Sequence, residues 1–292
     1  MHTLFIEEKN KTIQIADCWD ELNPDQLAFV FQHALLVTEG KLDYTQFCIL
    51  VFKYLTGLQI GAQYVAKEKL NLNTKINEQI YMLATSLCGW AFYESDKGLE
   101  LDYNSFTNPF RTIKLSRSIE LYGPADLIGD LIFKEFRYAI DQKDYYVAAI
   151  KESNFDEAEM HLNYFIACLY RRKDGKKRKP LNTDDLDALA KDVEGIPMWQ
   201  KQWILTWFSF CISYIKTVPF DIEGAEVELE LLFPESEVES IKGLGWSGIL
   251  IDITKSQVFG TLEQCDNYSL FRVLLFWYKT HLENLKEKAR NQ

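Results

Sequence analysis

Apolar residues occupy nearly every helical face of the segment 197–218, PMWQKQWILTWFSFCISYIKTV. Trp199, Trp203 and Trp207 lie four residues apart, and aromatic and aliphatic residues fill most of the remaining faces. Proline suits the first turn of a helix, and Pro219 stops the run at the other end. The pattern predicts a helix over 197–218, and a helix that is apolar on most faces must be surrounded by protein. The positions expected to face water are Gln200, Lys201, Gln202, Thr206, Ser209, Ser213 and Lys216.

Amphipathic periodicity predicts further helices on both sides of this segment. Asn23 followed by Pro24, and Asp43, are typical helix-start residues. The predicted helices cover 23–36, 43–58, 74–92, 126–145, a run that begins at Asp156, 184–193, 246–258 and 269–286. Two short alternating stretches, TLFIE at 3–7 and TIQIA at 12–16, predict an N-terminal β-hairpin.

Helical periodicity fails between 96 and 123, where Gly, Pro and Asn interrupt short alternating pieces such as LELDY and RTIKL. Such a stretch is typical of a connector with short strands and of a domain boundary. We therefore expect a mainly α-helical protein, a multi-helix bundle in two helical units. The units are 1–95, with the hairpin and three helices, and 124–292, built around the helix 197–218, with 96–123 as the connector.

Charge and composition narrow the function classes. The chain has 43 acidic and 32 basic side chains, and the net charge of −11 disfavours general nucleic-acid binding. The longest apolar run, 203–215, is shorter than the roughly 20 residues that span a bilayer. The start, MHTLFIEEKNK, lacks the apolar region of a signal peptide. These features predict a protein of the cytoplasm without a membrane partner.

The cysteines do not form a recognisable site. They are widely separated, there is no CxxC, and most lie in apolar helical runs, so we expect reduced, buried thiols. The six positions are Cys18, Cys48, Cys88, Cys168, Cys211 and Cys265. No Gly-x-Ser-x-Gly is present and no cysteine has an activating neighbour, so the sequence predicts no catalytic residues.

Gly243, Gly245 and Gly248 match the letters of the dinucleotide-binding loop GxGxxG, and Glu263 follows the first glycine by 20 residues. Such a loop must leave a buried strand, whereas the preceding ESEVESIK is polar and the surroundings are predicted helical. A turn at the entry to a helix is the better interpretation. We expect no cofactor.

The histidines give no metal set. They are His2, His33, His161 and His281. Glu157 lies one helical turn before His161, but a second Glu and His pair of this kind is absent, so a surface or interface histidine is favoured over a metal ligand.

The segment RRKDGKKRK at 171–179 carries seven cations in nine residues. It is interpreted either as a solvated loop or as a patch that contacts an acidic protein partner, with nucleic acid less favoured because of the overall charge. The possible partner-binding residues are Arg171, Arg172, Lys176, Lys177, Arg178 and Lys179. The tryptophans of 197–218 are expected to be core, and an exposed interface is the alternative.

The segments LIFKEF at 131–136 and LNYFIACLYR at 162–171 resemble segments of the tail-region proteins of bacteriophages and prophages. LIFKEF at 131–136 is similar to a helix start of the form LTxGEF, with Ile132 and Lys134 in place of Thr and Gly. LNYFIACLYR at 162–171 is similar to a helix that ends in IAxLYR before a basic loop. Weaker similarity extends to PDQLAFVFQHALLV, DYTQFCILVFKYLTGL, GWSGILIDITKSQVFG and SLFRVLLFWYK.

The resemblance implies a non-enzymatic role in building a tail, as an assembly chaperone or a minor structural component, and supplies no catalytic residues. The expected partner is a tail or virion protein, and the expected location is the host cytoplasm or the virion. Two alternatives stay open. One is a helical adaptor or regulator unrelated to phage, whose docking elements would be the basic segment and the acidic segment 224–240. The other is an enzyme whose site is assembled from scattered residues.

Overall fold

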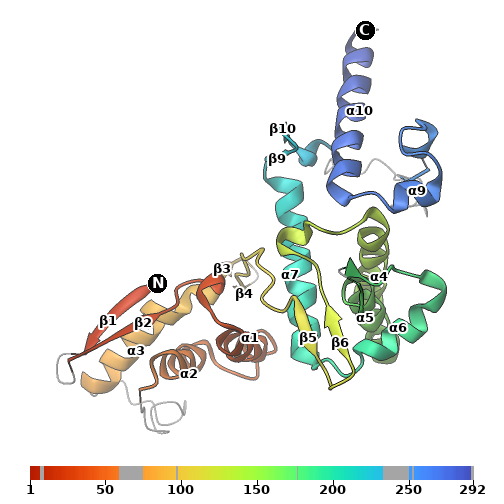
Figure 1. Cartoon of the computed structure of the whole chain (residues 1–292). Coiled ribbons are helices and arrows are strands. Elements are labelled where there is room, and N and C mark those ends of the chain that lie inside the picture. Colours follow the sequence, from red (N-terminus) through yellow and green to blue (C-terminus); the bar gives the residue numbers. More distant parts are fainter. Residues whose placement is uncertain are drawn as a thin grey trace. The chain divides into compact units, whose positions relative to one another are not determined.

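The computed structural model describes residues 1–6, 10–58, 75–96, 98–175, 177–232, 250–251 and 253–290. Helices dominate, and short antiparallel strand pairs accompany them (Figure 1), so the expected mainly α-helical class is confirmed. The chain forms two compact units, Met1–Ser105 and Phe106–Gln292. The division between them falls inside the segment 96–123 that the sequence assigns to a connector.

The first unit begins with the hairpin of β1 (His2–Ile6) and β2 (Lys11–Ile15), which confirms the expected N-terminal strand pair. The side chains of Asn23 and Asp43 cap the next two helices, each in a capping box with a glutamine. The unit continues with η2 (Trp19–Glu21), α1 (Pro24–Thr38), α2 (Tyr44–Thr56), α3 (Lys75–Cys88), η5 (Gly89–Ala91), and the antiparallel strands β3 (Phe92–Ser95) and β4 (Gly98–Leu101).

Trp19 is the centre of the first unit's core. Its ring is 1% exposed and packs edge-on against Phe31 and Trp90, and its indole N–H donates to the carbonyl of Asp102 at 2.6 Å. The indole of Trp90 donates to the carbonyl of Ala16 at 3.0 Å. Buried indoles need an acceptor for their N–H, so these bonds tie the segments around 16 and 102 to the helical core.

The second unit contains a helical hairpin, a long apolar helix and several strand pairs. Its elements are β5 (Thr112–Lys114), β6 (Glu120–Tyr122), η6 (Asp126–Ile128), α4 (Phe133–Lys151), α5 (Phe155–Leu169), β7 (Lys173–Asp174), β8 (Lys177–Arg178), η7 (Thr183–Asp185), α6 (Leu186–Val193), α7 (Met198–Thr217), β9 (Phe220–Ile222), β10 (Ala225–Val227), η8 (Leu229–Leu232), α9 (Leu262–Asp266) and α10 (Leu270–Arg290). Each strand pair is antiparallel.

Helix α7 is the apolar helix expected over 197–218, and it is enclosed by its own unit. Trp203 and Trp207 are fully buried, and Phe208 packs on Phe165 of α5. The indole of Trp207 donates to the carbonyl of Phe106 at 3.0 Å. Figure 1 shows α7 beside α5. The core interpretation of Trp203 and Trp207 is therefore confirmed.

Within the described residues, none of the helices combines the length and the apolar character that a bilayer crossing requires.

The expectation that Gln200 and Lys201 face water is wrong. They are 7% and 2% exposed, because the first turn of α7 is covered on this side as well, whereas Ser209 and Ser213 further along the helix are exposed. The ammonium of Lys201 donates to the Asn163 side chain at 2.7 Å and to the carbonyl of Glu194 at 3.3 Å. Burial lowers the pKa of Lys201, and the nearby acids Glu159 and Glu194 partly offset this.

Two predicted helix boundaries are also wrong. The helix expected from Asp126 begins at Phe133, because the Asp126 carboxylate accepts the backbone N–H of Asn108 and the chain turns through left-handed conformations at Leu127 and Ile128. The helix expected to reach Phe92 ends at Cys88, and Phe92 begins β3 instead. Outside the described residues lie the predicted helix start at Thr74 and the whole of 233–249, which holds the glycines 243, 245 and 248.

The burial of α7 predicts a large effect of Trp207→Ala. The variant leaves a cavity and removes the partner of the Phe106 carbonyl, so we expect the free energy of unfolding of the second unit to fall by about 3–5 kcal/mol. Ser209→Ala, an exposed change on the same helix, should stay within about 0.5 kcal/mol of the wild type. Urea unfolding followed by circular dichroism measures both, and equal effects would contradict the enclosed position of α7.

Candidate functional site

Two arginines of the basic segment 171–180, Arg171 and Arg178, point into the second unit, while most of its other described residues are exposed. Strands β7 and β8, of two residues each, form a short antiparallel hairpin, and Arg171 just before it is 1% exposed. The guanidinium of Arg171 forms an ion pair with Glu135 at the start of α4. It also donates to the carbonyl of Cys168, and at 2.7 Å to the carbonyl of Lys179 across the hairpin. Burial lowers the pKa of Arg171, and the carboxylate of Glu135 partly offsets this.

Arg178 reaches the same carboxylate from the other strand of the hairpin. Its side chain is 9% exposed, and one Nη donates to Glu135 at 3.1 Å. The other Nη donates to Asp130 at 2.9 Å and to the carbonyl of Gly123 at 3.0 Å. Glu135 is 5% exposed, so a single buried carboxylate holds two arginines. We call Glu135, Arg171 and Arg178 the buried ion network.

The interpretation of this segment as a solvated loop or an accessible patch is therefore wrong for Arg171 and Arg178. A lone buried charge is costly, and Glu135 and the backbone carbonyls supply partners that make their burial possible. Arg172 is about half exposed and forms an ion pair with Asp192, and Lys179 is exposed. Lys176 and the side chain of Lys177 lie outside the described residues.

A cleft of about 650 Å³ opens beside the buried ion network. Its walls come from the β5–β6 hairpin, the segment that leads into α4, the β7–β8 hairpin and Asn267 just after α9. Gly123 lies in this wall, and any larger residue there would collide with the ring of Tyr170. Arg178 and Glu135 form the charged part of the wall.

Two further cations lie in the lining of this cleft. The ammonium of Lys173 lies 3.8 Å from the centre of the Tyr122 ring, and Arg111 is exposed. Within the described part of the chain, neither side chain has a carboxylate partner. Tyr122 donates its hydroxyl to Glu120, which raises the pKa of Tyr122. The cleft thus combines carboxylates that pair with Arg178 and two cations that form no ion pair among the described residues.

A second surface feature is the end of the α4–α5 hairpin. Large apolar side chains are exposed there: Phe155 is 69%, Tyr145 55% and Ile150 41% exposed. The acidic side chains near them in the sequence are also exposed: Asp144, Glu152, Asp156, Glu157 and Glu159. We call this feature the α4–α5 corner. Aromatic residues are more frequent at protein contact surfaces than on the rest of the protein surface.

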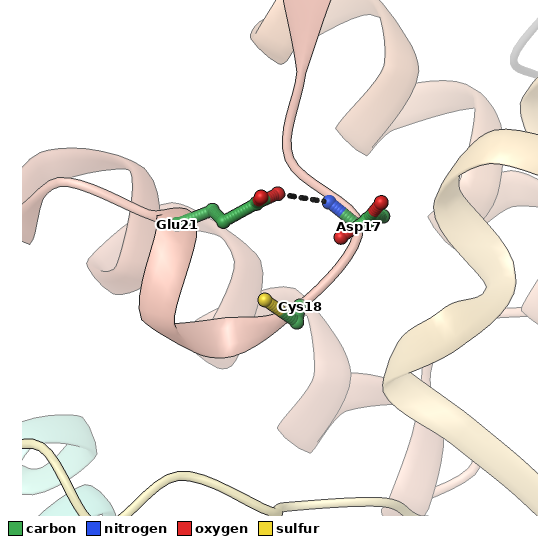
Figure 2. Close-up of side chains that lie close together, drawn as sticks. All are labelled: Asp17, Cys18 and Glu21. Carbon is green, nitrogen blue, oxygen red and sulfur yellow. Dashed lines mark hydrogen bonds between the residues drawn. The ribbon is translucent and has the colours of Figure 1, made fainter. Parts of the chain in front are cut away.

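Asp17, Cys18 and Glu21 could offer three ligand atoms to a metal ion (Figure 2), since these atoms lie within 4.8 Å of one another. Other contacts explain the cluster. The backbone N–H of Asp17 donates to Glu21 at 2.9 Å, and the amino group of Met1 lies 2.6 Å from Asp17 and 2.7 Å from Glu21. Burial raises the pKa of Cys18, which keeps its thiol protonated. The geometry is that of a hydrogen-bonded turn before η2.

Glu157 and His161, the pair considered at the sequence level, lie on one face of α5. The His161 Nε2 is 3.7 Å from the Glu157 carboxylate, and its Nδ1 is 2.8 Å from the Gln142 side chain. The ring also packs on Tyr145. Both ring nitrogens thus have a neighbour within the α4–α5 hairpin.

The chain matches no known protein-family model, no curated protein and no solved structure. Function must therefore be inferred from the chain's own residues.

Glu135→Gln tests the buried ion network. The variant keeps the side-chain shape but leaves the buried Arg171 without its counter-charge, so we expect unfolding free energy to fall by about 3–5 kcal/mol. Asp130→Asn, which alters an exposed partner of Arg178, should cost less than about 1 kcal/mol. Urea unfolding gives both values, and a neutral Glu135→Gln would contradict the network.

The buried cysteines predict slow alkylation and a loss of stability at high pH. Burial raises the pKa of Cys48 and Cys265 to about 11 and that of Cys88 and Cys168 to about 12. At pH 8, iodoacetamide should label Cys18 first and these four only on unfolding. An unfolded thiol ionises near pH 8.5, so the native state keeps protons that the unfolded state loses, and stability should fall as pH rises above about 8.5. Fast labelling of native Cys265 would contradict this.

Proposed function

We propose that this chain is a non-enzymatic protein of a phage or prophage tail, an assembly factor or minor structural component that works by contacting another protein. The phage context is supported by the resemblance of 131–136 and 162–171. Glu135 belongs to the first of these segments and Arg171 to the second, and the two residues form a buried ion pair. The residues that carry the resemblance therefore act together as one structural unit.

The exposed side chain of Phe155 is the observation that carries the contact role. Phe155, the first residue of α5, is 69% exposed, so most of its apolar surface is not covered by its own unit. Tyr145 and Ile150 extend the α4–α5 corner with further apolar area, and covering such side chains is the main source of affinity in protein interfaces.

The charge around the α4–α5 corner defines the partner's chemistry. Exposed acids accompany the apolar residues, and the whole chain carries a net charge of −11. The partner proposed is thus a tail or virion protein that presents an apolar segment flanked by lysine or arginine, with association faster at low salt. The chain would bind this partner in the host cytoplasm or in the virion.

Coexpression of the full chain with the virion proteins encoded beside it, followed by affinity capture, tests this proposal. We expect one of them to be retained, and Phe155→Ser combined with Ile150→Ser to reduce retention at least tenfold. Met82→Ser, which changes an equally exposed apolar residue in the first unit, is the matched control and should have no effect. Retention of no virion protein would contradict the phage role, and unchanged retention by the double variant would contradict the contact surface.

A further inference from the structure

We propose that the cleft between the β5–β6 and β7–β8 hairpins binds a small phosphate monoester with an apolar body. This is a ligand site separate from the protein contact at the α4–α5 corner. Its lining residues all belong to the second unit.

Charge at the cleft favours a dianion. Four cations meet there or directly behind the wall, Arg111, Lys173, Arg178 and Arg171, against the two carboxylates of Asp130 and Glu135. Within the described residues, Arg111 and Lys173 therefore have no ion-pair partner, while Glu120 binds the hydroxyl of Tyr122, on whose ring Lys173 lies. A phosphate monoester carries about −1.5 to −2 charges near pH 7, which matches this surplus. This local excess of positive charge is opposite in sign to the net charge of the whole chain, which is −11.

Arg111 and Lys173 are the accessible cations of the cleft. Arg178 in the wall and Arg171 behind it are held by Glu135 and by backbone carbonyls, so both are fixed in place. Arg111 and Lys173 are exposed and lack carboxylate partners within the described residues. Arginine donates two parallel N–H groups to phosphate oxygens and lysine acts as a point charge, so the pair can hold one phosphate group from two sides.

The size and lining of the cleft favour an organic body on the phosphate. Its volume, about 650 Å³, lies within the range of pockets for small organic ligands and exceeds what inorganic phosphate alone would fill. The ring of Tyr122, together with Ile132 and Pro180, supplies apolar area next to the cations. An ester whose apolar part packs on these residues should bind more tightly than free phosphate.

Isothermal titration with phenyl phosphate, inorganic phosphate and phenol tests the site. We expect phenyl phosphate to bind the full chain with a dissociation constant of about 1 mM or below, at least fivefold more tightly than inorganic phosphate, with no binding of phenol. Arg111→Ser combined with Lys173→Ser should weaken phenyl phosphate at least tenfold. Both side chains are exposed and lack carboxylate partners, so the thermal midpoint should stay unchanged.

Lys114→Ser combined with Lys179→Ser is the matched control, because both lysines are exposed and lie near the same hairpins without lining the cleft. Its affinity should equal that of the wild type. The absence of phenyl phosphate binding below about 10 mM would overturn the proposal, as would an equal loss of affinity in the control variant. Neither result bears on capture of a virion protein by the α4–α5 corner.

Discussion

The ion network of Glu135 with Arg171 and Arg178 is the interaction on which the second unit's functional face depends. Glu135 and Arg171 are buried and the Arg178 side chain is only 9% exposed, and a carboxylate shared by two arginines is stable only when both guanidinium groups and the carboxylate are well paired. The network joins the start of α4, the end of α5 and the β7–β8 hairpin. It therefore fixes the wall of the cleft and leaves the exposed cations Arg111 and Lys173 as the groups that can meet a ligand.

Buried indoles have a comparable structural role in both units. Trp19 donates to the carbonyl of Asp102 in the first unit, and Trp207 donates to that of Phe106 in the second. In each case a fully enclosed ring supplies apolar packing while its N–H binds an extended segment far away in the sequence. The helices and the non-helical segments are thus held together by the same residues. This leaves the cleft and the α4–α5 corner as surface features on a fixed framework.

Periodicity and capping residues were sufficient to predict most of the helices, because Asn23, Asp43 and the apolar faces act locally. The start at Asp126 could not be predicted, since the aspartate binds the backbone N–H of Asn108 instead of capping a helix. The burial of Arg171 and Arg178 could not be predicted from the sequence either. A run of cations is usually solvated, and their partner Glu135 lies more than 30 residues away in the chain. Burial of Lys201 depends likewise on the distant Asn163.

A double-mutant cycle between Glu135→Gln and Arg178→Gln tests the central claim most directly. The difference between the summed single effects and the double variant isolates the coupling of the two side chains. Because the pair is buried and within 3.1 Å, a coupling free energy above about 1 kcal/mol is predicted for unfolding. Additive effects within about 0.5 kcal/mol would show that Arg178 does not reach the carboxylate, and the inward placement of the basic hairpin would then be wrong.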